Sequence, residues 1–218
     1  MIVWLGGAFF VASLAWCAWW YLMRAGESRP YTGAAIPLDA ALFSVFALHH
    51  SLFARDSAKR WLTRVPRDLQ RSLYVYLASG LLIVVFVAWQ PIGGDLYRAG
   101  RLTALHIAVQ IAGIWVIARA VSKIDPLELA GIRPARSAEP LQTSGPYRWV
   151  RHPLYLGWVL AVFATPHVTG DRLTFAAVST AYLIAAVPWE ERSLVRAFGD
   201  DYIRYQRRVR WRIIPFIY

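Results

Sequence analysis

The chain has few charged residues and only one cysteine. Charged side chains make up 17% of its 218 residues, against 57% that are hydrophobic, and the mean hydropathy is +0.38. A water-soluble domain carries about 25% charged residues, so this composition indicates a membrane protein. Cys17 alone excludes a disulfide framework and a cysteine-based metal site. Inside an apolar run, it is expected to be a small buried residue.

The chain also lacks the patterns of a soluble nucleotide-binding domain. It contains no G-x-G-x-x-G sequence and no alternation of strand and helix patterns, which together mark a dinucleotide-binding fold. Acidic residues number 13 and basic residues 24, which gives a net charge of +11. Such an excess can indicate nucleic-acid binding, so its distribution along the chain decides its meaning.

Long apolar runs predict an all-α integral membrane protein, because a hydrocarbon core needs about 20 helical residues. Six spans are expected, the last two as a tight hairpin. They cover residues of about 1–23, 36–54, 72–90, 102–121, 153–166 and 172–189. The first run has no basic start and no small-residue cleavage site, so it is expected to remain as a helix.

The basic residues gather between or after particular spans. Nineteen of the 24, with Arg119 at the end of span four included, lie between spans two and three, between spans four and five, or after span six. The positive-inside rule places these segments and both termini in the cytoplasm. The charge is therefore attributed to membrane topology, and no nucleic-acid partner is expected. The expected location is therefore a cytoplasmic membrane, which the chain crosses several times.

A proline-containing connector, residues 123–141, separates two parts of the chain. We expect an N-terminal four-helix transmembrane part over residues 1–122 and a C-terminal functional part over residues 123–218.

The stretch GPYRWVRHPLYLGW, residues 145–158, places cations at the start of an apolar helix. His152 precedes Pro153, which favours an extended His152 and puts Pro153 at the first helical position. Free backbone N–H groups there and the guanidinium of Arg151 suit a carboxylate or phosphate. The same positive field predicts a neutral His152. Alternatively, Arg148 and Arg151 only anchor the chain at the membrane interface.

A second segment, WEERSLVRAFGDDYIRYQRRV at residues 189–209, predicts a C-terminal amphipathic helix with an aromatic face. Glu190 and Glu191 lie at the end of span six, and ionisable groups at such a depth default to a functional role. Together the two segments supply an anion-binding helix start and paired carboxylates, which would match a zwitterionic ligand.

The order of these residues resembles the signature of the integral-membrane methyltransferases, a superfamily that includes isoprenylcysteine carboxyl methyltransferase and phospholipid N-methyltransferases. The resemblance rests on Gly145-Pro146-Tyr147, Arg151-His152-Pro153, Tyr155, Gly157, Glu190-Glu191, Leu194, Phe198-Gly199, Tyr202, Tyr205 and Ile214-Pro215. The segment Val209–Arg212 is more basic than is usual before the final Ile-Pro.

The N-terminal half resembles the bacterial branch that contains methanethiol S-methyltransferase and the NnrU-type proteins. This resemblance rests on His50-Ser51 with Phe53-Ala54-Arg55, Arg71-Ser72-Leu73-Tyr74 and Trp89-Gln90-Pro91-Ile92-Gly93-Gly94. It implies methylation of a small thiol such as methanethiol, with a prenylated cysteine carboxylate or a phospholipid amine as alternatives. The acceptor is expected to enter from the lipid bilayer.

The superfamily implies S-adenosylmethionine as methyl donor, bound at the cytoplasmic face, and no metal. The implied catalytic residues are Arg151, His152 and Glu191. The implied cofactor-binding residues are Gly145, Pro146, Tyr147, Arg151, His152, Pro153, Tyr155, Gly157, Glu190, Glu191, Tyr202 and Tyr205.

The histidines allow a hypothesis of another class. His49, His50 and His106 could ligate haem or a metal in an NnrU-like membrane binding protein. Adjacent helical residues face different directions, so His49 and His50 are not expected to line one site together.

Overall fold

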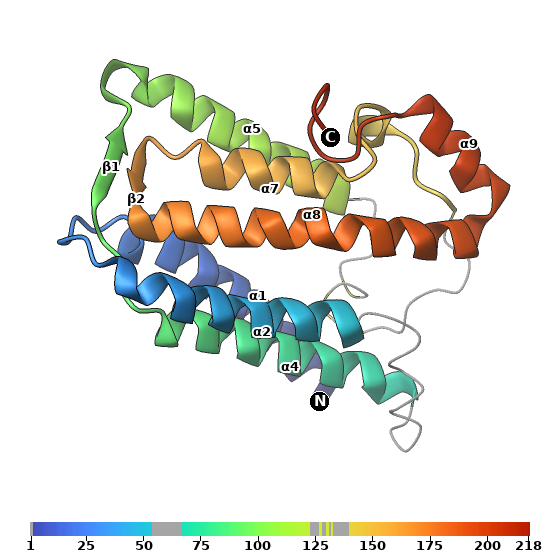
Figure 1. Cartoon of the computed structure of the whole chain (residues 1–218). Helices are drawn as coiled ribbons and strands as arrows, with labels where there is room; N and C mark the ends of the chain where they lie inside the picture. Colours follow the sequence, from blue (N-terminus) through green and yellow to red (C-terminus); the bar gives the residue numbers. More distant parts are fainter. Residues whose placement is uncertain (1, 54–66, 123–126, 128–129, 131, 133–139) are drawn as a thin grey trace. The chain divides into compact units, whose positions relative to one another are not determined.

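The computed structural model describes residues 2–53, 67–122, 127, 130, 132 and 140–218 (Figure 1). The basic residues expected between spans two and three lie partly outside the described residues, as does most of the connector expected at residues 123–141.

Among the described residues, five long helices are apolar enough to cross a membrane. They are α1 (Ile2–Trp19) with its π-helical continuation (Trp20–Arg24), α2 (Ile36–Phe53), α4 (Arg67–Ala88), α5 (Thr103–Val121) and α8 (Gly170–Phe198). The expectation of an all-α membrane protein is confirmed. A sixth crossing is not, because α7 (Pro153–Phe163) has 11 residues and is about 16 Å long, against a hydrocarbon core of roughly 30 Å.

The end of α7 leads into a short strand rather than a plain turn. Strand β2 (His167–Thr169) pairs with β1 (Asp95–Arg98). Directly after β2, Asp171 on α8 accepts hydrogen bonds from the indole N–H of Trp89 at 2.9 Å and from the backbone N–H groups of Ile92 and Gly93 at 3.1 and 2.8 Å. A buried carboxylate thereby holds the turn after α4.

The first compact unit contains α1, α2, α4 and the start of α8, up to Val178. Its core is aromatic. Trp20 lies 4.7 Å from Phe86, 5.0 Å from Trp89 and 5.6 Å from Phe175, measured between ring centroids. Rings at such separations add packing energy beyond their buried area.

The second compact unit contains α5, α7, the remainder of α8 from Ser179, and α9 (Asp200–Arg208). Helices α5 and α7 touch at two glycines. A Cβ atom on Gly157 would lie 2.6 Å from the carbonyl oxygen of Gly113, and one on Gly113 would lie 2.7 Å from that of Gly157. Packing thus groups α5 with the C-terminal helices, whereas the boundary expected after residue 122 assigned it to the N-terminal part.

The C-terminal segment is divided differently from the sequence-based expectation. Pro188 does not end α8, which continues to Phe198 and so carries both Glu190 and Glu191. Gly199 has a positive φ of 55° and separates α8 from α9, a conformation that glycine adopts at little cost. The amphipathic helix exists, but it covers Asp200–Arg208 and not the whole of residues 189–209.

Candidate functional site

The start of α7 has the predicted local structure. Gly145, with a φ of +62°, opens a 3-10 turn over Gly145–Arg148. Pro153 is the first residue of α7 and His152 is its N-cap. The backbone therefore presents Arg151 and His152 directly before a helix N-terminus, as the sequence predicts.

A returning C-terminal segment runs beside this turn. The backbone N–H of Arg151 donates to Trp211 at 2.9 Å, and that of His152 donates to Arg212 at 2.8 Å. The Arg151 guanidinium adds two bonds from Nη1, to the carbonyl oxygens of Val209 at 2.9 Å and Arg210 at 2.8 Å. The residues after α9 are thus held against the start of α7.

Arg151 also forms the tightest ion pair of the site. Its Nε donates to Oε1 of Glu191 at 2.6 Å, and both side chains are 7% exposed. The second oxygen of Glu191 lies 3.3 Å from Nε2 of Gln206 and 3.4 Å from Nε of Arg212. Removing one partner of a buried pair leaves an uncompensated charge, so this network ties α7, α8 and the C-terminal segment together.

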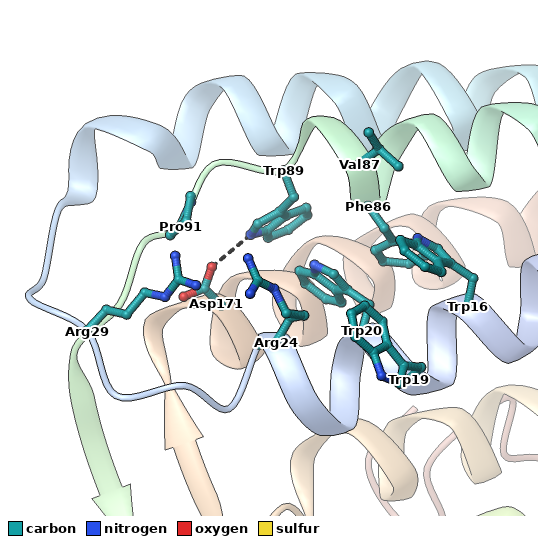
Figure 2. Close-up of a pocket in the computed structure, with 11 residues that line it drawn as sticks. Trp16, Trp19, Trp20, Arg24, Arg29, Phe86, Val87, Trp89, Pro91 and Asp171 are labelled. Carbon is teal, nitrogen blue, oxygen red and sulfur yellow. Dashed lines mark hydrogen bonds between the residues drawn. The ribbon is translucent and has the colours of Figure 1, made fainter.

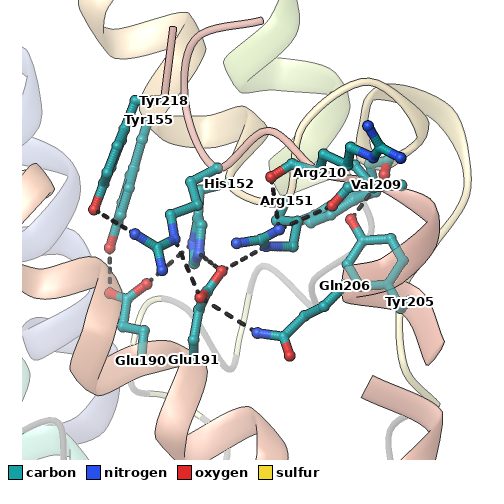
Figure 3. Close-up of polar contacts among 12 residues, drawn as sticks. Arg151, His152, Tyr155, Glu190, Glu191, Tyr205, Gln206, Val209, Arg210 and Tyr218 are labelled. Carbon is teal, nitrogen blue, oxygen red and sulfur yellow. Dashed lines mark hydrogen bonds and ion pairs between the residues drawn. The ribbon is translucent and has the colours of Figure 1, made fainter. Parts of the chain in front are cut away.

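His152 lies between the two carboxylates (Figure 3). Its Nδ1 is 3.4 Å from Oε2 of Glu190, and its Nε2 is 3.5 Å from Oε1 of Glu191. The imidazole stacks on the Tyr155 ring with 5.3 Å between centroids, and the Tyr155 hydroxyl donates to Glu190. The side chain of Glu190 is 43% exposed. Of the two carboxylates, it is the one open to a ligand.

The protonation expected for His152 is wrong. Burial lowers the pKa of His152, but the hydrogen bonds and charges of Glu190 and Glu191 outweigh it, and the pKa lies above its ordinary value of 6.5. The sequence argument counted only the positive field of the α7 N-terminus. Two carboxylates delivered by α8 reverse the sign of the local field, so the imidazolium form is favoured.

Beside this polar network lies a cluster of tyrosines. Tyr202 and Tyr205 of α9 are buried and pack with Tyr147, and the Tyr205 hydroxyl donates to the carbonyl of Tyr147 at 2.7 Å. Burial is the main cause that raises the pKa of all three phenols, which therefore stay neutral. The Tyr202 hydroxyl is buried and has no hydrogen-bond partner among the described residues.

The structure thus brings together most of the predicted site residues. Arg151, His152, Tyr155, Glu190 and Glu191 form the polar network, and the three tyrosines lie in the adjacent cluster. Pro146 and Pro153 are buried parts of the two turns.

Gly157 and Gly145 differ in their surroundings. Gly157 permits a close backbone approach, but the approaching backbone is that of α5. Around Gly145, a Cβ would meet no atom within 4 Å, which leaves room for a ligand there.

Three further residues of the site were not identified from the sequence. Gln206 and Arg212 contact Glu191, and the Tyr218 hydroxyl accepts from Nη1 of Arg212 at 3.1 Å. The unusual basicity of Val209–Arg212 was the only signal. Arg212 explains part of this basicity, because it pairs with Glu191. No local sequence pattern links these two residues.

The histidines of the alternative hypothesis each have their own contacts. His50 shares a hydrogen bond of 2.8 Å with the hydroxyl of Tyr74, and His49 stacks against Phe53 and Tyr74. His106 belongs to the other unit, where its Nδ1 lies 3.2 Å from the carbonyl of Thr165. Within the described part of the chain, no three His, Cys, Asp or Glu residues form a group that could hold a metal ion.

Comparisons with known proteins agree with the resemblance. The profile of the isoprenylcysteine carboxyl methyltransferase (ICMT) family matches residues 102–196. A protein of Crocosphaera subtropica named methanethiol S-methyltransferase is 37% identical over 202 residues, which is 88% of this chain and 79% of that protein. One of Bradyrhizobium diazoefficiens named methanethiol S-methyltransferase 2 is 40% identical over 188 residues, 81% of this chain and 72% of that protein.

More distant similarity extends to an animal protein. Nurim of Xenopus laevis is 30% identical over 168 residues, which is 68% of this chain and 58% of that protein. No solved structure matches the chain. From the extent of the first two similarities and the ICMT-family match, the chain belongs to the membrane methyltransferase family that joins isoprenylcysteine carboxyl methyltransferase with the methanethiol S-methyltransferases, and it is a methyltransferase.

Proposed function

We propose that the protein transfers the methyl group of S-adenosylmethionine to a small thiol such as methanethiol. The observation that carries the donor site is the convergence of Arg151, His152 and Tyr155 from the start of α7 with Glu190 and Glu191 from α8. The thiol is favoured because the relatives that align along most of the chain are named methanethiol S-methyltransferases.

Three features of the site fit a zwitterionic donor. Glu190 is the more exposed carboxylate, the Tyr202 hydroxyl is buried without a described partner, and the space around Gly145 is open. An unpaired buried hydroxyl costs free energy unless a ligand group satisfies it. The donor carries a carboxylate, an ammonium group and ribose hydroxyls, which can use these positions.

The contacts of the carboxylates refine the assignment of roles. Glu191 is paired with Arg151 and Arg212, so we assign it to holding the site together. Glu190 is assigned to the donor's ammonium group or ribose hydroxyls. His152 and the α7 N-terminus are assigned to its carboxylate, because an imidazolium and free backbone N–H groups both favour an anion. Tyr147 and Tyr155, which are only partly buried, offer aromatic faces to a cationic donor.

When bound, S-adenosylmethionine supplies a methyl group already activated by a sulfonium centre. The protein then needs mainly to align the acceptor and exclude water. A thiol must also lose its proton, because the thiolate is the nucleophile. Arg148 and Arg210 favour the thiolate by their charge, whereas Arg151 and Arg212 are paired with Glu191.

We further propose that the site and both termini face the cytoplasm of a bacterial inner membrane. The support is the distribution of basic residues, of which Arg192, Arg196, Arg204, Arg207 and Arg208 follow Glu191 directly. S-adenosylmethionine would then reach the site from the cytoplasm, and a small or lipophilic acceptor from the bilayer.

A methyl-transfer assay with radiolabelled donor tests the proposal. The purified protein is offered methanethiol, a prenylcysteine and phosphatidylethanolamine in separate reactions. We expect labelled thioether from the thiol and negligible label in the other two. Preferred labelling of prenylcysteine or of the phospholipid amine would support the alternative acceptors and reject the thiol.

A further inference from the structure

A cavity lies within the first compact unit (Figure 2). It encloses about 380 Å³ and is formed by α1 with its π-helical end, the end of α4 and the following turn, the loop carrying Arg29, and the start of α8. None of the proposed donor-binding residues lines it. A methanethiol molecule would fill only a small part of this volume.

The walls of the cavity are aromatic. Trp20, Phe86 and Trp89 are buried at 5%, 4% and 7% exposure, whereas Trp16 and Trp19 at the rim are 39% and 45% exposed. The rings of Trp16 and Trp19 lie 4.9 Å apart. Tryptophans concentrated at the end of a span occupy the level of the lipid headgroups, so the cavity opens where a membrane meets water.

One end of the cavity is polar. Figure 2 shows the guanidinium groups of Arg24 and Arg29 at one end, and Trp16, Phe86 and Val87 at the other. Both arginines share a single carboxylate, Glu27. The hydrogen bonds to Glu27 use Nη1 of Arg24, and Nε and Nη2 of Arg29. The guanidinium groups retain donors with no partner among the described residues, and such forked donors suit phosphate oxygens.

Asp171 also lines the cavity, and its charge would oppose an anion. However, it is 4% exposed, and its two oxygens accept three hydrogen bonds from Trp89, Ile92 and Gly93. Its oxygens are therefore already hydrogen-bonded within the protein, whereas the side chains of Arg24 and Arg29 are 50% and 33% exposed.

We propose that this cavity binds the headgroup of a membrane phospholipid. Arg24 and Arg29 hold the phosphate, and the acyl chains follow the apolar rim at Trp16, Trp19 and Val87. A phosphate alone would leave the aromatic wall wet, and an acyl chain alone would leave the guanidinium donors unused. Only an amphiphile with both parts matches the two ends.

Native mass spectrometry of the delipidated full-length protein tests the site. The protein is titrated with phosphatidylglycerol or phosphatidylethanolamine, and the apparent Kd of the first bound lipid is measured. We expect Arg24→Gln/Arg29→Gln to weaken this binding at least tenfold, because charge-assisted bonds to the phosphate are lost. Arg24→Lys/Arg29→Lys keeps the charge and should retain part of the affinity.

The control and the alternatives are defined in the same experiment. Arg98→Gln/Arg101→Gln removes two other arginines, neither of which lines the cavity, and should leave the first Kd unchanged. Inorganic phosphate at millimolar concentration should fail to displace the lipid. Displacement by phosphate alone, equal loss in the control, or unchanged affinity in a folded Arg24→Gln/Arg29→Gln variant would each reject the phospholipid site.

Discussion

Glu190 and Glu191 are neighbours in sequence but have different surroundings, which predicts separable effects. Glu190→Gln should reduce the affinity for S-adenosylmethionine by about 1–3 kcal/mol, the range for losing a charged hydrogen-bond partner, with little change in melting temperature. Glu191→Gln leaves the buried Arg151 guanidinium without its counter-charge and should reduce stability by about 3–5 kcal/mol. Calorimetry and thermal melting measure the two effects.

The split between these variants is the informative result. Equal destabilisation by both would show that Glu190 also holds the fold together. Undiminished donor binding in a folded Glu190→Gln variant would remove Glu190 from the donor site.

His152 predicts a pH-dependent contribution to stability. Its pKa is raised in the folded protein, where burial opposes protonation but Glu190 and Glu191 prevail. A group of this kind stabilises the fold fully below its unfolded pKa of about 6.5, and the contribution is lost as the pH rises through the higher folded pKa. His152→Gln should therefore lower the melting temperature more at pH 6 than at pH 9.

The same melting series in a Glu190→Gln background supplies the control. Removing one of the two carboxylates should reduce the difference between pH 6 and pH 9. A penalty for His152→Gln that grows toward pH 9 would show that a neutral imidazole is the stabilising form.

At the scale of helices, the contact of α5 with α7 depends on two glycines. A Cβ on Gly157 would lie 2.6 Å from the carbonyl oxygen of Gly113, which is shorter than any normal contact and involves backbone that cannot turn away. Gly157→Val should separate these helices, lower the melting temperature and reduce activity by displacing the α7 N-terminus. Small residues at such crossings are what allows membrane helices to pack closely.

Gly80→Ala on α4 is the matched control. The nearest atom to its Cβ would be in Phe9 at 3.9 Å, an ordinary contact, and alanine is favoured over glycine in a helix by about 1 kcal/mol. The substitution should be neutral or stabilising. Equal losses in both variants would contradict the assignment of a specific role to the α5–α7 crossing.

The positions of the helices were predicted from the sequence better than the contacts that the helices make. Apolar runs located the five long helices, because the length of a span is fixed by bilayer thickness. The break at Gly199 was missed, since the apolar and aromatic spacing continues across it and only a positive φ marks the end of α8. Strands β1 and β2 were missed because a pairing of 3–4 residues leaves no periodicity to recognise.

The candidate site shows the same limit. Motif order identified Arg151, His152 and Glu191, but the sequence could not show that Arg151 pairs with Glu191 or that Arg212 reaches the same carboxylate. These contacts join residues 40 and 21 positions apart. The predicted state of His152 was wrong for this reason, since its pKa depends on carboxylates brought by another helix.

For the whole molecule, the asymmetry of basic residues predicts orientation. Nineteen of the 24 basic residues fall in segments expected on one side, so a reporter fused after Tyr218 should behave as cytoplasmic. Arg101→Cys, in a Cys17→Ala background, should react with a membrane-impermeant maleimide added from the periplasmic side. Periplasmic activity of the fusion would contradict this orientation and would place the proposed site away from cytoplasmic S-adenosylmethionine.

The choice of acceptor can be decided from the protonation of the substrate. If a thiolate is the nucleophile, the rate at subsaturating thiol should rise about tenfold per pH unit below the thiol's pKa. A prenylcysteine carboxylate is already ionised above pH 6, given reference values near 3.5, so its methylation should lack this dependence. Because His152 titrates above 6.5, it could also shape the profile. Measuring the pH–rate profile with two small alkyl thiols of different pKa separates these causes. An inflection set by the acceptor moves with the pKa of the thiol. An inflection set by His152 stays at the same pH for both thiols and disappears in His152→Gln. We expect the inflection to move with the thiol. The thiol proposal would be rejected if the inflection stayed fixed and prenylcysteine were the better substrate.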